Sequence, residues 1–259
     1  MKKTDLLQLL DKIAPLSLAM EWDNCGMQTE LGKTEINKVY AALEVTDQVI
    51  EHAAYLGCDM IITHHPLILP SFALTSLDVR KPLDRNITEL IKRGMEVYSA
   101  HTCFDIAPGG NNDYLCSMLG IEKVSAICGG IARIGALKKA VRLSDFERSV
   151  FEKLGKPVGF LCGGDPARQI KTVALCTGGA GEYWPEALAA GADLYITGEI
   201  KHHEAAAIKQ TGMAYIAAGH AGTEWIFVPN MAEQLRKGSL DALTVYEEKD
   251  HLIPFDRSY

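Results

Sequence analysis

Apolar and polar positions along the chain follow the same order in two separate segments. Residues 36–67 read INKVYAALEVTDQVIEHAAYLGCDMIITHHPL, and residues 170–201 read IKTVALCTGGAGEYWPEALAAGADLYITGEIK. Each segment has a β-rich run, a polar turn, a helical pattern, a glycine and a second apolar run. One constant offset aligns Ile36 with Ile170, Gly57 with Gly191, and Asp59 with Asp193. The pattern predicts two parallel strands joined by a crossover helix in each copy.

A second pair of related segments follows the first. GMEVYSAHTCFD (94–105) resembles GMAYIAAGHAGTE (212–224), since both have Gly-Met, a short β-rich run and then a histidine. Asp105 stands four residues after His101, and Glu224 stands four residues after His220. Two ordered pairs of matches predict an α/β protein that arose by internal duplication.

The duplication suggests two α/β halves with approximate boundaries, residues 1–125 and residues 126–259. The segment 125–169 is rich in glycine and is expected to link the halves. The C-terminal segment is a candidate to pack on the first half. At the N-terminus, Leu6, Leu9, Leu10 and Ile13 have the spacing of an amphipathic helix rather than a signal peptide. No apolar stretch approaches the ~18 residues that a membrane span needs, so we expect no membrane partner and a cytoplasmic location.

Composition narrows the classes of function. The formal net charge is −7, which gives no broad cationic surface, so binding to nucleic acid is not expected. The seven cysteines contain no C-x-x-C pair, which argues against a zinc ribbon and a disulfide framework. We interpret them as reduced thiols, mostly in the core. A small polar ligand or a metal ion fits this composition better than a polyanion.

Candidate chemistry collects where predicted strands end. In an open parallel sheet, functional groups gather just beyond the carboxyl ends of the strands. Three such ends supply four histidines and two carboxylates, which are His64, His65, His101, Asp105, His220 and Glu224. Imidazole and carboxylate without a thiolate cluster suit zinc, iron, manganese or another divalent ion. Because neighbouring side chains on an extended backbone point apart, His64 and His65 are expected to serve one ion each in a two-ion site.

Other polar motifs have simpler interpretations. Isolated histidines usually make structural hydrogen bonds, which is our interpretation of His52, His202, His203 and His251, although His202 and His203 could line a pocket. Gly178, Gly179 and Gly181 lie between a strand and a helix, where glycines form either a phosphate site or, more often, a tight turn. In MEWDNCGM (20–27), Asp23 and Asn24 are expected to bond the backbone at a helix-to-loop junction.

These motifs together resemble one family. EWDNCG, CDMIITHHPL, SAHTCFDIAPGGNNDYL, GGAGEYWPEALAAGADLYITGEIKHHEA and AGHAGTE occur in this order along nearly the whole chain. The chain is similar to the NIF-three-like dinuclear-metal proteins, which are often named GTP cyclohydrolase 1 type 2 homologues. The resemblance implies two intertwined three-layer α/β/α halves with mixed or parallel sheets, and a toroidal homohexamer.

The resemblance also ranks the site residues. It implies two divalent ions per subunit, held by His64, His65, Asp105, His220 and Glu224, with Glu224 reaching both ions. His101 would be an acid/base residue beside the ions rather than a ligand. The ions could be zinc, iron or manganese.

Two classes of function follow from the resemblance. The first is a metal-dependent hydrolase of a nucleotide or similar small molecule, and both amidohydrolase and phosphoesterase chemistry suit a two-ion site. The family name implies hydrolytic opening of the GTP imidazole ring with release of formate. The alternative is a metal-binding adaptor or metal-handling assembly that engages a partner protein. Polar residues beyond the ligands, such as Asn24, His202 and Glu199, favour a substrate.

Overall fold

The computed structural model describes residues 1–69 and 78–249 and divides into two compact units. Among the described residues, the first unit contains 1–110 and 227–249, and the second contains 111–226. Each unit is an α/β structure built on its own sheet, which confirms the predicted fold class. His251 lies outside the described residues. Within the described ranges, no helix is both long and apolar enough to cross a bilayer.

The sheet of the first unit has the strand order β1-β4-β3-β2-β11. Strands β4, β3, β2 and β11 are parallel neighbours in that order, and β1 is antiparallel to β4. The strands are β1 (Gly26–Thr29), β2 (Lys38–Ala42), β3 (Met60–Thr63), β4 (Glu96–Ser99) and β11 (Thr244–Glu247). The helices are α1 (Lys3–Ile13), α2 (Asp47–Tyr55), α3 (Pro82–Arg93), α4 (Thr102–Ile106) and α10 (Phe227–Ser239).

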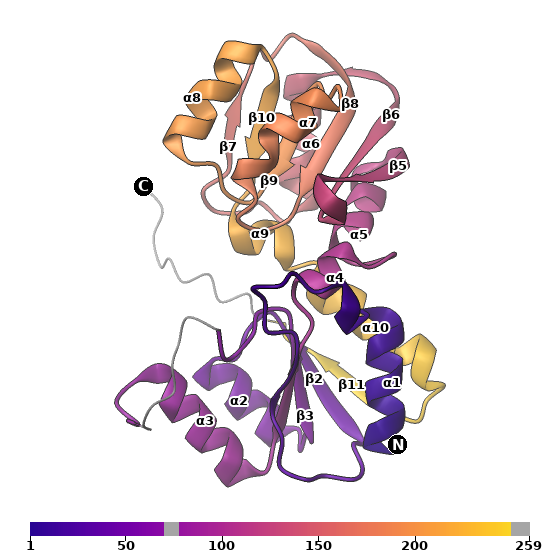
Figure 1. Ribbon diagram of the computed structural model, residues 1–259, viewed down its shortest axis with the longest axis vertical. Helices are drawn as coiled ribbons and strands as arrows, with labels where there is room; N and C mark the ends of the chain where they lie inside the picture. The colour runs from indigo at the N-terminus through magenta and orange to yellow at the C-terminus, as the bar shows by residue number, and fades with distance from the viewer. Residues whose placement is uncertain (70–77, 250–259) are drawn as a thin grey trace. The chain divides into compact units, whose positions relative to one another are not determined.

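Helices cover both faces of this sheet, as the purple and yellow elements of Figure 1 show. Strands β3 and β4 are buried at every position, because a parallel sheet between two helical layers has no solvated face. Tyr40 and Ile61 pack with residues of α2 and α3 in one hydrophobic cluster. Helices α1 and α10 pack on each other, and α10 also contacts β2 and β11. The first half is therefore a three-layer α/β/α unit.

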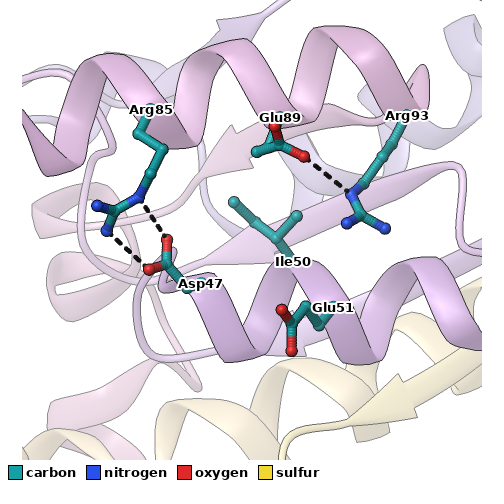
Figure 2. A pocket seen from close by; sticks show the side chains of 6 residues that line it. All are labelled: Asp47, Ile50, Glu51, Arg85, Glu89 and Arg93. Carbon is teal, nitrogen blue, oxygen red and sulfur yellow. Dashed lines mark hydrogen bonds and ion pairs between the residues drawn. The ribbon is translucent and has the colours of Figure 1, made fainter. Parts of the chain in front are cut away.

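A groove runs between α2 and α3 on the surface of the first unit (Figure 2). Its volume is about 220 Å³, and two arginine–carboxylate pairs flank the buried side chain of Ile50. Arg85 reaches across from α3 to Asp47 of α2 with Nη2 and Oδ2 2.7 Å apart, whereas Arg93 pairs with Glu89 on its own helix. Because these charges neutralise each other, we interpret the groove as a helix–helix junction rather than a site.

The second unit has the strand order β5-β6-β8-β9-β10-β7. Strands β8, β9 and β10 are parallel, while β5, β6 and β7 pair antiparallel with their neighbours. The strands are β5 (Ile121–Ile127), β6 (Ala132–Arg142), β7 (Leu161–Gly163), β8 (Gln169–Cys176), β9 (Leu194–Thr197) and β10 (Ala214–Ala217). The helices are α5 (Asn111–Leu119), α6 (Leu143–Lys153), α7 (Trp184–Ala189), α8 (His202–Thr211) and α9 (His220–Glu224).

The duplication is visible in the strand register. Val39 pairs with Met60 in the first unit, and Val173 pairs with Leu194 in the second, at the same offset that aligns the sequences. Asp59 Oδ2 accepts hydrogen bonds from the backbone N–H groups of residues 37 and 38. Asp193 Oδ2 accepts the same two bonds from residues 171 and 172. The two copies therefore share the strand–helix–strand path. They also share an aspartate whose carboxylate accepts two backbone hydrogen bonds from the chain at the first strand.

The chain between the copies differs from the sequence expectation. Residues 125–169 were expected to link the halves, but they form the end of β5, then β6, α6 and β7, which all belong to the second unit. Their apolar side chains, including Leu137, Leu143, Phe146 and Val150, pack in the core of that unit. The antiparallel strands β5, β6 and β7 lie outside the repeated segments, so the repeat did not predict them. Only the glycine content of this segment was left as a signal, and it suggested a linker. The units divide near residues 110 and 226, whereas the sequence suggested a division near 125.

A buried ion pair ties the N-terminal helix to the first sheet. Lys3 Nζ lies 2.8 Å from Glu96 Oε2, and Glu96 is 0% exposed. Although burial raises the pKa of Glu96, hydrogen bonds from Lys3 and from the backbone N–H groups of Leu31 and Lys33 lower it overall. Burial lowers the pKa of Lys3, but its bonds to Glu96 and Glu30 raise it overall.

Glu96→Gln should lower the free energy of unfolding by about 3–5 kcal/mol, because it leaves the Lys3 ammonium buried beside a neutral group. Since the pKa of Glu96 is lowered on folding, its stabilisation is present above the ordinary value of 4.5 and is lost as pH falls. The stabilisation that Lys3 contributes is lost as pH rises beyond the ordinary lysine pKa of 10.5. Urea unfolding measured from acid to alkaline pH checks both limbs.

Glu30→Gln is the matched control, because Glu30 also pairs with Lys3 but its side chain is 67% exposed. We expect this variant to lose less than about 1 kcal/mol. Equal losses in the two variants would contradict the role given to the buried pair.

Candidate metal centre

Three histidines converge in the first unit. His64 and His65 follow β3, and His101 follows the parallel neighbour β4, so both strand ends deliver imidazoles to one edge of the sheet. Each of the three offers a ring nitrogen within 4.8 Å of the others. Strand β3 ends at Thr63, so strand alternation no longer applies, and the His64 and His65 rings lie 5.4 Å apart. The expectation that these side chains point apart was therefore wrong, and this group could hold a metal ion.

The orientation of His64 is fixed by a backbone hydrogen bond. Its Nδ1 lies 3.0 Å from the carbonyl oxygen of Ala100, so Nδ1 carries the proton and donates it. Its Nε2 is then a lone-pair donor, and it lies 3.7 Å from Asp105 Oδ2. His64 and Asp105 are both buried, and helix α4 presents Asp105 one turn after His101. This pair has the donor atoms that a divalent ion prefers.

His101 is held by the carboxylate of Asp23, which is distant from it in the sequence. Asp23 Oδ1 lies 3.0 Å from His101 Nδ1, and the Asp23 side chain is fully buried. The same carboxylate accepts hydrogen bonds from the backbone N–H and the hydroxyl of Thr102, from the N–H of Asn24 and from the thiol of Cys25. Asp23 thus fixes the His101 ring through Nδ1 and directs Nε2 towards the histidine group.

The charge of Asp23 is stabilised by these donors. Burial raises the pKa of this carboxyl, but the hydrogen bonds from His101 and Thr102 outweigh burial and hold the pKa well below its ordinary value. From the sequence, only backbone hydrogen bonds are expected of Asp23, because His101 lies 78 positions away along the chain. The dense polar and aromatic stretch EWDNCG was the available signal.

The second unit contributes an imidazole–carboxylate pair of its own. Helix α9 follows β10 and carries His220 and Glu224 one turn apart, which explains the spacing of four residues. His220 Nε2 lies 3.1 Å from Glu224 Oε2, and Glu224 is buried. His220 Nδ1 lies 3.3 Å from Glu199 Oε1. Glu199 occupies the position that His65 holds in the first copy, so the duplicated position has changed from an imidazole to a carboxylate that contacts one.

Glycines give this pair its space. A Cβ atom on Gly178 would overlap Glu224 Oε1 and would lie 3.4 Å from His220 Nε2. A Cβ atom on Gly198 would lie 2.8 Å from His220 Cα. These contacts give a reason for the glycines at positions 178 and 198 that neither the turn nor the phosphate interpretation included. Both glycines let the backbone approach the His220 and Glu224 side chains closely.

Gly178→Ala should lower the affinity for divalent metal by about 10–100-fold, because the added methyl group displaces the Glu224 carboxylate. Gly191→Ala is the matched control. Both glycines have positive φ, +73° and +84°, so both variants should lose about 1–2 kcal/mol of stability, but no atom lies within 4 Å of a Cβ on Gly191. Zinc titration and urea unfolding of both variants check this, and equal zinc affinities would contradict the role of Gly178.

The remaining candidates lie apart from these groups. His52 is exposed on α2, and His202 and His203 are exposed in the first turn of α8. The Asn24 amide is used within its own loop, where it donates to the carbonyl of Ile68 at 2.6 Å and to Gln28. Of the additional polar residues that were expected to face a substrate, Glu199 lies beside His220, whereas the Asn24 amide serves the loop.

Known proteins share this sequence and fold. A curated relative from Lactococcus lactis is 32% identical over 98% of this chain and 99% of its own, and one from Clostridium perfringens is 30% identical over 99% of both. Both carry the name GTP cyclohydrolase 1 type 2 homolog. A Saccharomyces cerevisiae relative, 30% identical over 89% of this chain and 88% of its own, is named NGG1-interacting factor 3.

A solved structure supports the same fold. The crystal structure of a Bacillus cereus protein related to NIF3 covers 100% of this chain and 99% of its own, with a TM-score of 0.91 and 20% identity. The profile of the family described as Duf34/NIF3 (NGG1p interacting factor 3) matches residues 1–250. With a match over nearly its whole length, the chain belongs to the Duf34/NIF3 family.

Proposed function

We propose that this chain is a metal-dependent hydrolase of a nucleotide or similar small molecule, with a two-ion centre. The observation that carries the proposal is the orientation of the histidines. The Nδ1 atom of His64 lies 3.0 Å from an oxygen acceptor, and that of His220 lies 3.3 Å from one. His65 Nδ1 faces Glu44 at 3.9 Å. Oxygen acceptors on Nδ1 are the arrangement that prepares Nε2 for metal binding.

We assign five residues to the centre, as the family resemblance implies. The first unit supplies His64, His65 and Asp105, and the second supplies His220 and Glu224. The donor set of imidazole nitrogens and carboxylate oxygens suits zinc, iron or manganese. The space that Gly178 leaves for Glu224 supports the assignment, because a side chain there would displace a ligand atom.

His101 is the residue that we propose moves protons. Divalent ions in such a centre supply Lewis acidity, which polarises a substrate oxygen and lowers the pKa of water. Asp23 keeps the proton of His101 on Nδ1. The Nε2 atom of His101 takes no part in that hydrogen bond, and it can accept a proton from water or return one to a leaving group. These roles suit hydrolysis of an amide-like ring bond and of a phosphoester equally. The names of the relatives make GTP the first substrate to test.

A substrate screen tests the proposal. The chain is loaded separately with zinc, manganese and iron(II) and incubated with GTP, other nucleotides and a phosphodiester, with release of formate and phosphate measured. We expect turnover in at least one metal form, and the same protein treated with a chelator should be inactive. Metal-loaded protein that turns over none of these substrates would contradict the hydrolase proposal.

The name of the yeast relative favours a second candidate function, a metal-binding adaptor that engages a partner protein. This candidate predicts bound metal without turnover.

We also propose, from the family resemblance, that the chain forms a homohexamer. Light scattering on the purified protein gives the mass, and a monomer at micromolar concentration would contradict the hexamer.

A further inference from the structure

Trp22 lies beside His101 with most of its surface exposed. The residue is 57% exposed, and its ring centroid lies 5.9 Å from that of the His101 imidazole. Exposure alone is no signal, since Tyr55 is 90% exposed at the end of α2. What distinguishes Trp22 is its place next to the histidine that Asp23 orients. An exposed indole presents a large apolar surface to water, and such a surface can bind a ligand.

The loop that carries Trp22 is firmly held, so the exposure of its ring does not come from a loose segment. The backbone N–H of Met20 donates to the Thr102 hydroxyl at 3.0 Å, and that of Asp23 donates to the carbonyl of Met20 at 2.9 Å. Asp23 and Asn24, the two residues after Trp22, use their side chains to bond Thr102 and Ile68. The neighbours of Trp22 are therefore bonded inward while the indole itself stays exposed.

We propose that Trp22 is a stacking platform for a flat nitrogen heterocycle of the substrate. This inference rests on the proposed function, because it places the heterocycle next to His101. A nucleobase stacks on an aromatic side chain with little dependence on its identity, since every base has a π-face. Trp22 is 57% exposed, so its side chain is accessible to such a ring.

The angle between the two protein rings orients the stacked heterocycle. The planes of Trp22 and His101 are inclined by 78°. A ring that lies parallel to the indole is therefore nearly perpendicular to the imidazole, and in the proposed binding mode it turns its edge towards His101. The edge carries the ring C–N bonds and the exocyclic carbonyl groups of a nucleobase. Trp22 would thus bind the heterocycle and also present its hydrolysable edge to the proposed acid/base residue.

Binding of two nucleosides tests the platform without any turnover. Guanosine, uridine and ribose are added separately to the zinc-loaded chain, and their dissociation constants are measured by equilibrium dialysis. We expect at least one nucleoside to bind, with Trp22→Leu weakening its binding by about 10-fold or more. Trp22→Phe keeps a π-face and should restore most of the affinity. Ribose binding and zinc content should be the same in all three proteins.

Tyr55→Leu is the matched control, because it removes an exposed aromatic ring elsewhere in the same unit. Nucleoside binding that is unaffected by Trp22→Leu, or no saturable binding of either nucleoside, would overturn the proposal. Tetramethylammonium separates stacking from recognition of a cation, and a Trp22-dependent affinity for this cation but not for nucleosides would also overturn it. Trp22-dependent nucleoside binding without hydrolysis would contradict only the proposed function.

Discussion

Glu224→Gln should lower the affinity of the chain for divalent metal by more than about 100-fold, because the neutral amide replaces the anionic ligand. Glutamine keeps the shape of the side chain, so the close approach to Gly178 and the position of α9 are retained. The Glu224 carboxylate lies 3.1 Å from His220 Nε2, so its charge is directed at the same place as a second ligand atom. His65→Ala should have a similar effect on metal content.

Glu204→Gln is the control for this variant. Glu204 is also a buried glutamate of the second unit, 6% exposed against 3% for Glu224. Its carboxylate accepts the backbone N–H of Lys201 at 2.7 Å at the start of α8, so it serves a helix terminus. Zinc titration by calorimetry should show unchanged affinity in Glu204→Gln. Stoichiometric metal in Glu224→Gln at wild-type affinity would contradict the assignment of Glu224.

Asp23→Asn should lower turnover by about 10²–10⁴-fold while leaving the metal content unchanged, because Asp23 positions the residue that moves protons. Asp23 uses Oδ1 for His101 and Oδ2 for the N–H and the hydroxyl of Thr102. An asparagine keeps one acceptor oxygen, which we expect to stay with the two Thr102 donors, so that the NH₂ group replaces Oδ1 beside His101. The His101 ring then has no acceptor to hold the proton on Nδ1. The ¹⁵N shifts of His101 report the tautomer directly, and we expect them to show a loss of the Nδ1–H form.

Asn24→Ala separates this effect from loosening of the loop. The Asn24 side chain donates a hydrogen bond to the carbonyl of Ile68, and its removal leaves the hydrogen-bond partners of Asp23 unchanged. Both variants should lose about 1–3 kcal/mol of stability, since each disrupts buried hydrogen bonds. Only Asp23→Asn should change the His101 tautomer and the turnover. An unchanged tautomer in Asp23→Asn would show that Asp23 is only structural.

Much of the fold could be predicted because the duplication repeats a local pattern. The strand–helix–strand path of 36–67 and 170–201 follows from apolar periodicity and from Gly57 and Gly191, both of which have positive φ at the turn before the second strand. The position of the donors at strand ends follows from the same periodicity. The sequence suggested only that the C-terminal segment packs on the first half. The strand that β11 joins could not be predicted, because that pairing depends on contacts over about 200 residues, such as Val39 with Val245.

The candidate site was predictable in its residue types and less so in its supporting contacts. The repeated spacing of four residues corresponds to about one helical turn. It places His220 and Glu224 on one face of α9, whereas His101 is the N-cap of α4, one turn before Asp105. The contact of Asp23 with His101 joins two segments that show no common periodicity. The role of Gly178 depends on how closely the Glu224 side chain approaches the backbone at this glycine, and the sequence does not specify that distance.

Metal stoichiometry tests the central claim most directly. The chain is stripped of metal with a chelator, and zinc, manganese and iron(II) are then titrated separately at neutral pH while the bound metal is counted by elemental analysis. The account predicts saturation at about two ions per chain for at least one of these metals. Saturation below one ion per chain with all three metals would contradict it.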